Sequence, residues 1–227
     1  MFPLRDDIPS RRPPVVTYAV IAANVLIFFY ETQLGGDLES FIHDFGLVPV
    51  HFRAAHGAER WIPVFTSMFL HGGLLHLLGN MLYLHIFGDN VEDRLGHLRF
   101  LFFYLLCGVA AALGQVLLAP GSRLPMVGAS GAIAGVTGAY FVFFRHARIL
   151  TIVPIFFYAE LVQIPAVVFL VFWFVMQLAY GAASLGMQGA EMGGVAWWAH
   201  IGGFLCGIVA GRALAPPPRP ETARWTS

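Results

Sequence analysis

Six apolar stretches, separated by polar or mixed segments, dominate the hydrophobic pattern of the chain. A membrane-spanning helix needs about 20 mostly apolar residues. The stretches that approach this length are Val15–Leu34, Gly73–Asn90, Leu98–Ala119, Ala129–Phe144, Ile164–Leu185 and Val195–Leu214. The second and the fourth are short and rich in small residues, which suits helices buried inside a bundle. The pattern predicts an all-α polytopic membrane protein with six transmembrane helices.

The segments between these stretches predict how the rest of the chain is organised. Gly35–Phe65 is long and mixed, and we expect an ordered loop that lies partly in the membrane interface. Ile149–Gln163 is interrupted by Pro154 and Glu160, so we place it at the membrane surface. The resulting division is a short N-terminal segment over residues 1–14, a transmembrane core over 15–214 and a Pro-rich tail over 215–227.

The composition agrees with a chain whose main solvent is lipid. Hydrophobic residues make up 58% of the chain and charged residues 11%, whereas soluble domains carry about a quarter of charged residues. Every basic residue is an Arg and the net charge is zero, so no cationic tract is available for nucleic acid. Cys107 and Cys206 both lie inside apolar stretches and are expected to be core residues; no disulfide, metal site or cofactor is predicted.

The distribution of arginines predicts the orientation. If the N-terminus is cytoplasmic, ten arginines fall on the inner side and three, namely Arg53, Arg60 and Arg123, on the outer side. Cytoplasmic loops of membrane proteins carry an excess of basic residues. Both termini are therefore predicted to be cytoplasmic.

Polar side chains inside the apolar stretches fall at one similar depth. Polar groups buried in a bilayer are costly, so each marks a candidate functional position. With the predicted topology, His71, His76 and Asn80 lie at the outer end of the second stretch, and Ser130 lies at the outer start of the fourth. His200 lies within the first turns of the sixth stretch from the same side. We expect these three helices to bring their polar residues together.

Two stripes of small residues predict which helices pack closely. They are Gly131, Gly135 and Ala139 in the fourth stretch, and Ala199, Gly203, Gly207 and Gly211 in the sixth. Small residues at every fourth position let transmembrane backbones approach each other. If the two stripes face each other, Ser130 and His200 come within reach across the seam.

A serine and a histidine in this arrangement predict nucleophilic catalysis. A serine hydroxyl needs a base that takes its proton, and a general base has to be the neutral imidazole. No Asp or Glu lies near His200 within a span, which favours a dyad over a triad. His76 and Asn80, one helical turn apart, and the backbone N–H of Ser130 could donate hydrogen bonds to the oxyanion of a tetrahedral intermediate.

Four short motifs occur in order along the chain. They are His71–Asn80 with the pattern His-x4-His-x3-Asn, Glu92-Asp93-Arg94-Leu95-Gly96, Gly128-Ala129-Ser130-Gly131 and Ala199-His200-Ile201-Gly202-Gly203. In sequence and order they resemble the motifs of the rhomboid family of intramembrane serine proteases. The resemblance covers about residues 15–212.

This resemblance implies a rhomboid-like bundle of six core helices. The compact six-span core itself fits a bacterial inner membrane. The resemblance also implies cleavage of single-span transmembrane substrates near the outer membrane surface, with a preference for small residues at the scissile bond. Ser130 would be the nucleophile, His200 the base, and His76 and Asn80 the oxyanion donors. His71 would be a structural residue above the site, and Gly128, Gly131 and Gly203 would shape the site. The oligomeric state is left open.

Two positions depart from the family pattern. Many members carry an aromatic residue one turn after the serine, where it stacks on the histidine, but this chain has Ala134. A Trp-Arg pair is common in the first outer loop, whereas this chain has Arg60-Trp61 in the reverse order. The sequence therefore does not show how His200 is oriented or how the loop is held.

Two other functional classes stay open at this point. Intramembrane histidines also bind haem, metal ions or transported substrates, although no pair of histidines here has obvious ligand spacing. A catalytically inactive relative that only binds membrane proteins is the third possibility, and the presence of both Ser130 and His200 speaks against it.

Overall fold

Helices make up most of the computed structural model, which describes residues 1–155, 157–185 and 195–217. The long helices are α1 (Val15–Glu31), α5 (Leu74–Leu95), α6 (His97–Leu118), α7 (Ser130–Phe143), α8 (Ala166–Leu185) and α9 (Trp197–Leu214). Shorter helical elements join α1 to α5: η1 (Gly35–Asp37), α2 (Leu38–Phe45), α3 (Pro49–Ala54), η2 (Glu59–Trp61), α4 (Ile62–Thr66) and η3 (Ser67–Phe69). The strands are β1 (Phe2–Asp6), β2 (Arg148–Ile155) and β3 (Tyr158–Pro165).

A helix occupies each of the six predicted stretches. Among the described residues, α6 and α8 are by themselves long and apolar enough to cross a membrane. The number rises to four if two bent pairs each count as one span, the pairs being Val15–Glu31 with Gly35–Phe45 and Glu59–Phe69 with Leu74–Leu95. α7 is apolar but shorter. The chain is therefore mostly helical with two to four candidate spans by length and composition.

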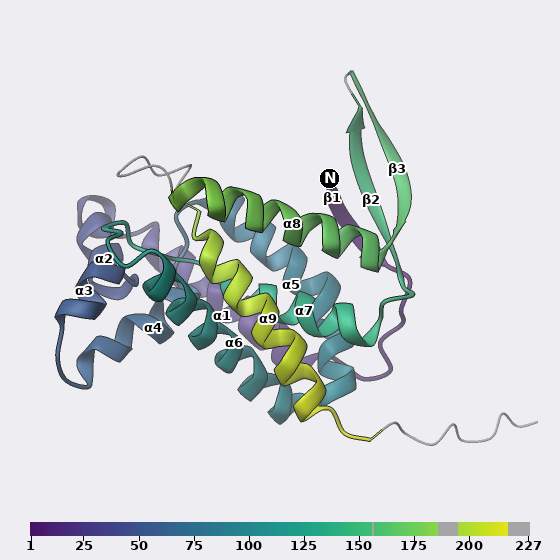
Figure 1. Cartoon of the computed structure of the whole chain (residues 1–227), viewed down its shortest axis with the longest axis horizontal. Helices are drawn as coiled ribbons and strands as arrows, with labels where there is room; N and C mark the ends of the chain where they lie inside the picture. The colour runs from purple at the N-terminus through teal and green to yellow at the C-terminus, as the bar shows by residue number, and fades with distance from the viewer. Residues whose placement is uncertain (156, 186–194, 218–227) are drawn as a thin grey trace, which may run out of the picture.

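The helices form one bundle with different structures at its two ends (Figure 1). The short helices α2, α3 and α4 lie at one end, and the strands lie at the other end (Figure 1). The N-terminus and the last turn of α9 both lie toward the end that carries the strands (Figure 1). The two described ends of the chain thus share one side of the bundle.

Burial separates the inner helices from those on the outside. From Gly131 to Tyr140, every residue of α7 is buried, which agrees with the expectation for a short helix rich in small residues. In contrast, large apolar side chains of α1 and α8 are exposed, including Leu26 at 69% and Phe172 at 51%. Soluble monomers rarely expose contiguous apolar surface of this kind. The outer faces therefore suit contact with lipid.

The three-stranded antiparallel sheet, in the order β1-β2-β3, corrects the prediction of an all-α fold. In β2, β-branched residues alternate in burial, so that Ile149 and Thr151 are fully buried between less buried neighbours. Such alternation favours a strand. β1 pairs with β2, for example Phe2 with Ile152. Residues 1–14 are therefore not a loose segment, because their strand is built into the sheet.

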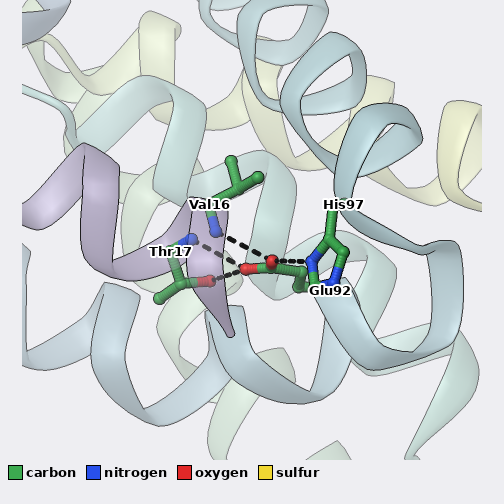
Figure 2. Close-up of polar contacts among 4 residues, drawn as sticks. All are labelled: Val16, Thr17, Glu92 and His97. Carbon is green, nitrogen blue, oxygen red and sulfur yellow. Dashed lines mark hydrogen bonds and ion pairs between the residues drawn. The ribbon is translucent and has the colours of Figure 1, made fainter. Parts of the chain in front are cut away.

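Glu92 stabilises the start of α1 from the neighbouring helix α5. Its carboxylate accepts hydrogen bonds from the backbone N–H of Val16 and Thr17 at 2.9 and 2.7 Å and from the Thr17 hydroxyl at 2.7 Å. His97 pairs with the same carboxylate (Figure 2). The first N–H groups of a helix have no partner within it, and a negative charge is favourable there. The Glu92–Gly96 motif thus holds the turn between α5 and α6 against α1.

Candidate active site

The start of α7 fixes the position of Ser130, which is the first residue of this helix. Gly128 immediately precedes the turn and has φ +120°, a conformation that side-chain-bearing residues rarely adopt. A Cβ atom at Gly128 would lie 2.8 Å from Nε2 of His76. Its backbone N–H donates to the carbonyl of Ser67 at 2.9 Å. A glycine is therefore needed here to bring the chain before Ser130 against His76.

The seam between α7 and α9 is a contact between backbones. A Cβ atom at Gly203 would lie 2.0 Å from the carbonyl oxygen of Gly131, and one at Gly207 would lie 1.9 Å from that of Gly135. Real Cβ atoms do not come so close, so each position accepts only hydrogen. The two stripes of small residues face each other, as expected from the sequence.

Across this seam, the Oγ atom of Ser130 lies 2.9 Å from Nε2 of His200. Both side chains are half-buried. They line a cavity of about 630 Å³ together with His76, Asn80 and Trp173. The predicted site residues from α5, α7 and α9 therefore meet at one cavity. This places a hydroxyl within hydrogen-bonding distance of an imidazole at the wall of a cavity.

The surroundings of His200 come mainly from α8. Oε1 of Gln177 lies 2.8 Å from Nδ1 of His200, the ring nitrogen that faces away from Ser130. The rings of Trp173 and His200 have their centroids 5.9 Å apart at an angle of 37°. Trp197 approaches the His200 ring edge-on, with centroids 6.3 Å apart. Residues of α8 and α9 thus surround the imidazole. Ala134, at the position where many family members have an aromatic residue, has no ring that could stack on it.

Asn80 and His71 are linked beneath the loop that leads into α5. Nδ2 of Asn80 lies 3.0 Å from Nε2 of His71, and both side chains are buried. The backbone N–H of His71 donates to the buried carboxylate of Glu31 at 3.1 Å. The ring of His76 meets that of His71 edge-on with centroids 5.2 Å apart. An amide nitrogen carries two hydrogens, so Asn80 retains one donor beyond its bond to His71.

Arg60 and Trp61 are held within the segment between α1 and α5. The guanidinium carbon of Arg60 lies 5.1 Å from the ring centroid of Phe52 and 5.5 Å from that of Trp61. The rings of Phe52 and Trp61 pack edge-on. The reversed Arg-Trp order therefore still gives cation–π contacts. Residues 35–65, which were expected to form a loop, contain short helices instead.

Sequence reasoning did not identify Gln177 or Trp173. An amide inside an apolar span is itself a functional signal, so Gln177 could have been found in the same way as Ser130 and His200. The contact between Gln177 and His200 could not have been predicted, because packing determines which face of α8 lies against α9. In the described parts of the chain, no three His, Cys, Asp or Glu side chains gather as ligands for a metal ion.

Comparison with known proteins agrees with the motifs. The family profile described as the Rhomboid domain matches residues 58–217. Rhomboid protease GluP of Bacillus subtilis (strain 168) is 33% identical over 134 residues, which are 56% of this chain and 24% of that protein. RHOMBOID-like protein 6, mitochondrial, of Arabidopsis thaliana is 30% identical over 170 residues, 74% of this chain and 48% of that protein.

A fungal relative shows the same degree of similarity. Rhomboid protein 1, mitochondrial, of Saccharomyces cerevisiae is 30% identical over 154 residues, 66% of this chain and 41% of that protein. The chain thus spans less than half the length of each of these three relatives. Because the Rhomboid domain profile covers most of the chain, this multi-pass membrane protein belongs to the rhomboid family.

Proposed function

We propose that this protein is an intramembrane serine endopeptidase that cleaves single-span transmembrane proteins near the outer membrane surface. The observation that carries the proposal is the 2.9 Å contact between Oγ of Ser130 and Nε2 of His200 at the wall of a cavity. Membership of a family with relatives named as proteases supports it.

The chemistry follows the order of an acyl transfer. Oγ of Ser130 attacks the scissile carbonyl carbon while Nε2 of His200 takes the hydroxyl proton. The tetrahedral intermediate then collapses, the C–N bond breaks, and His200 returns the proton to the leaving amine. A water molecule, deprotonated by His200, hydrolyses the acyl-enzyme and frees Ser130. In both steps, Nε2 of His200 thus takes the proton of the attacking group and passes it to the leaving group.

The developing oxyanion needs hydrogen-bond donors near Ser130. Asn80 and His76 line the same cavity as Ser130, and the Ser130 N–H has no acceptor within its own helix because it belongs to the first turn. We assign these three groups to the oxyanion. His71, which bonds to Asn80, has a structural role.

Cleavage of a single-span test substrate with small residues at the outer end of its helix tests the dyad. We expect Ser130→Ala and His200→Ala each to lower kcat by about 10⁴–10⁶, because two residues that act as a unit fail together. Ser122→Ala and His146→Ala are the matched controls, since both residues lie outside the cavity. Substantial cleavage by either dyad variant in a folded state would refute the proposal. If the unaltered protein does not cleave the substrate, the alternative of a catalytically inactive relative that only binds membrane proteins is favoured.

The oxyanion assignment has its own test in the same assay. Asn80→Ala is expected to lower kcat by about 10²–10³, the usual cost of removing one oxyanion donor. Because Asn80 also bonds to His71, thermal unfolding of the variant has to be measured alongside. An unchanged kcat would reduce Asn80 to a structural residue.

We further propose six spans with both termini in the cytoplasm of a bacterial cell, the core being residues 15–214. The ten-to-three distribution of arginines supports this orientation, as does the common side of the two described ends (Figure 1). The tail beyond residue 217 lies outside the described residues. A C-terminal reporter that is active only in the cytoplasm should be active; an inactive but intact fusion would contradict the topology.

A further inference from the structure

Gln177 is an unusual residue in its helix. α8 contains no charged residue, and Gln177 is its one amide. The side chain is 6% exposed and faces the bundle. A buried amide is costly unless its hydrogen-bonding groups are satisfied, and lipid hydrocarbon around a helix offers no partner for them. Its position in α8 therefore points to a specific partner.

The two ends of the Gln177 amide have different partners. Nε2 lies 3.4 Å from the backbone carbonyl oxygen of Trp173, one turn earlier in the helix. A carbonyl oxygen only accepts hydrogen bonds, so it faces the NH₂ group of the amide. The amide oxygen is then directed at Nδ1 of His200, 2.8 Å away. The helix backbone thus fixes which end of the amide meets the histidine.

This orientation determines the tautomer of His200. An amide oxygen is only an acceptor, so Nδ1 of His200 has to carry the hydrogen. In a neutral imidazole the other nitrogen is then a free acceptor. That nitrogen, Nε2, lies 2.9 Å from Oγ of Ser130. The Ser130 hydroxyl can donate to it, which is the arrangement needed for removal of its proton.

We propose that Gln177 is the positioning residue of His200: it selects the tautomer with hydrogen on Nδ1 and holds the ring toward Ser130. The inference rests on the proposed protease function. A neutral amide does this without a second buried charge, and it still accepts from Nδ1 when His200 is protonated during turnover. Gln177 on α8 thereby orients the His200 ring, a role that an aromatic residue at position 134 would otherwise have.

Two substitutions of similar shape separate positioning from packing. Gln177→Met fills the same space with a thioether, which is only a weak acceptor, whereas Gln177→Glu keeps an oxygen at the same place. We expect Gln177→Met to lower kcat by about 10- to 100-fold, as when partners that orient metal-bound histidines are removed, with KM nearly unchanged. Gln177→Glu should recover most of this loss. Ser184→Ala is the matched control, because Ser184 lies on α8 and, among the described residues, donates its hydrogen bond to the carbonyl of Gly181.

A purely structural role predicts another result. If folded Gln177→Met has the kcat of the unaltered protein, or if Gln177→Glu loses as much activity as Gln177→Met, the assignment is overturned. If the Ser130→Ala variant cleaves the substrate as the unaltered protein does, the proposed function is overturned instead. Either Gln177 result, obtained while cleavage still depends on Ser130, contradicts the positioning role and leaves the proposed function standing.

A second measurement determines the tautomer in the unaltered protein, and one variant serves only to assign the signal. Nitrogen-15 spectra of histidine-labelled protein, with the His200 signal assigned by its loss in His200→Ala, report which ring nitrogen carries hydrogen. We expect a protonated Nδ1 and an unprotonated Nε2 at neutral pH. The reverse tautomer would contradict the role of Gln177.

Discussion

Asp6 is a carboxylate whose charge is poorly accommodated in the folded protein. It accepts hydrogen bonds from the Tyr140 hydroxyl and from Nδ2 of Asn90. Burial raises the pKa of Asp6 from its ordinary value of 3.8 to about 6, the negative charges of Asp89 and Asp7 add to the rise, and the bond from Tyr140 opposes it. β1 is therefore fixed to the bundle through a group that favours being protonated.

The sign of the resulting pH dependence follows from this raised pKa. The contribution of Asp6 to stability is complete below its ordinary pKa of 3.8 and is lost as the pH rises through about 6. We expect the hydrogen-exchange protection factors of the β1 amides to fall over this interval. Asp6→Asn keeps an acceptor oxygen but cannot ionise, so its protection should stay level. An equal fall in the variant would assign the effect to other groups.

At the scale of residues, the sequence predicts the reacting groups better than their partners. Ser130 and His200 stand out because hydroxyl and imidazole groups in small-residue stripes of apolar stretches are rare. Gln177 lies in α8 without any motif around it. Its bond to His200 depends on the rotation of α8 against α9, and a pattern along one helix does not contain that rotation.

Among the elements, the seam between α7 and α9 positions the two reacting residues. Gly131 follows Ser130, and Gly203 lies one turn after His200; their missing side chains allow the backbones to touch. At Gly207 the space for a Cβ atom is occupied by the backbone of Gly135, whose carbonyl oxygen would lie 1.9 Å away. Backbone atoms cannot turn aside as a flexible side chain can. The separation of the two helices is therefore set by glycine.

One added methyl group tests this seam. Gly207→Ala is expected to lower the free energy of unfolding by about 1–3 kcal/mol, the usual cost of overpacking. Gly79→Ala on α5 is the control, because a Cβ atom there would meet nothing within 4 Å. Replacing glycine in a helix at an open position stabilises by up to about 1 kcal/mol. Detergent unfolding curves that rank the two variants in the opposite order would contradict the account of the seam.

The sequence predicted the helices well and missed the sheet. Long apolar stretches are a local signal, and each contains a helix of the structure. Strands β1 and β2 are far apart in the sequence, as the pair Phe2 and Ile152 shows. The sequence of either segment does not indicate which segment it pairs with. Pro154, which interrupts the apolar pattern of its segment, lies within β2.

On the scale of the whole molecule, the site lies inside a bundle whose ends differ. The sheet and the two described ends of the chain are at one end, and α2, α3 and α4 at the other (Figure 1). α8 covers the site from outside with exposed apolar side chains such as Phe172 and Val175. The cavity is lined mostly by apolar groups, and Ser130, His200 and Asn80 contribute polar side chains to it. Such a lining agrees with the proposed hydrolysis of a peptide bond that lies within a membrane.

Reaction with a phosphonofluoridate shows whether Ser130 is an activated nucleophile, independently of any substrate. Mass spectrometry of the protein in detergent should show one adduct, located on Ser130. The rate of its formation should fall by about 10² or more in His200→Ala, because general base catalysis contributes at least this factor. An adduct on another residue, no adduct, or an unchanged rate without His200 would contradict a nucleophile and base formed by these two side chains.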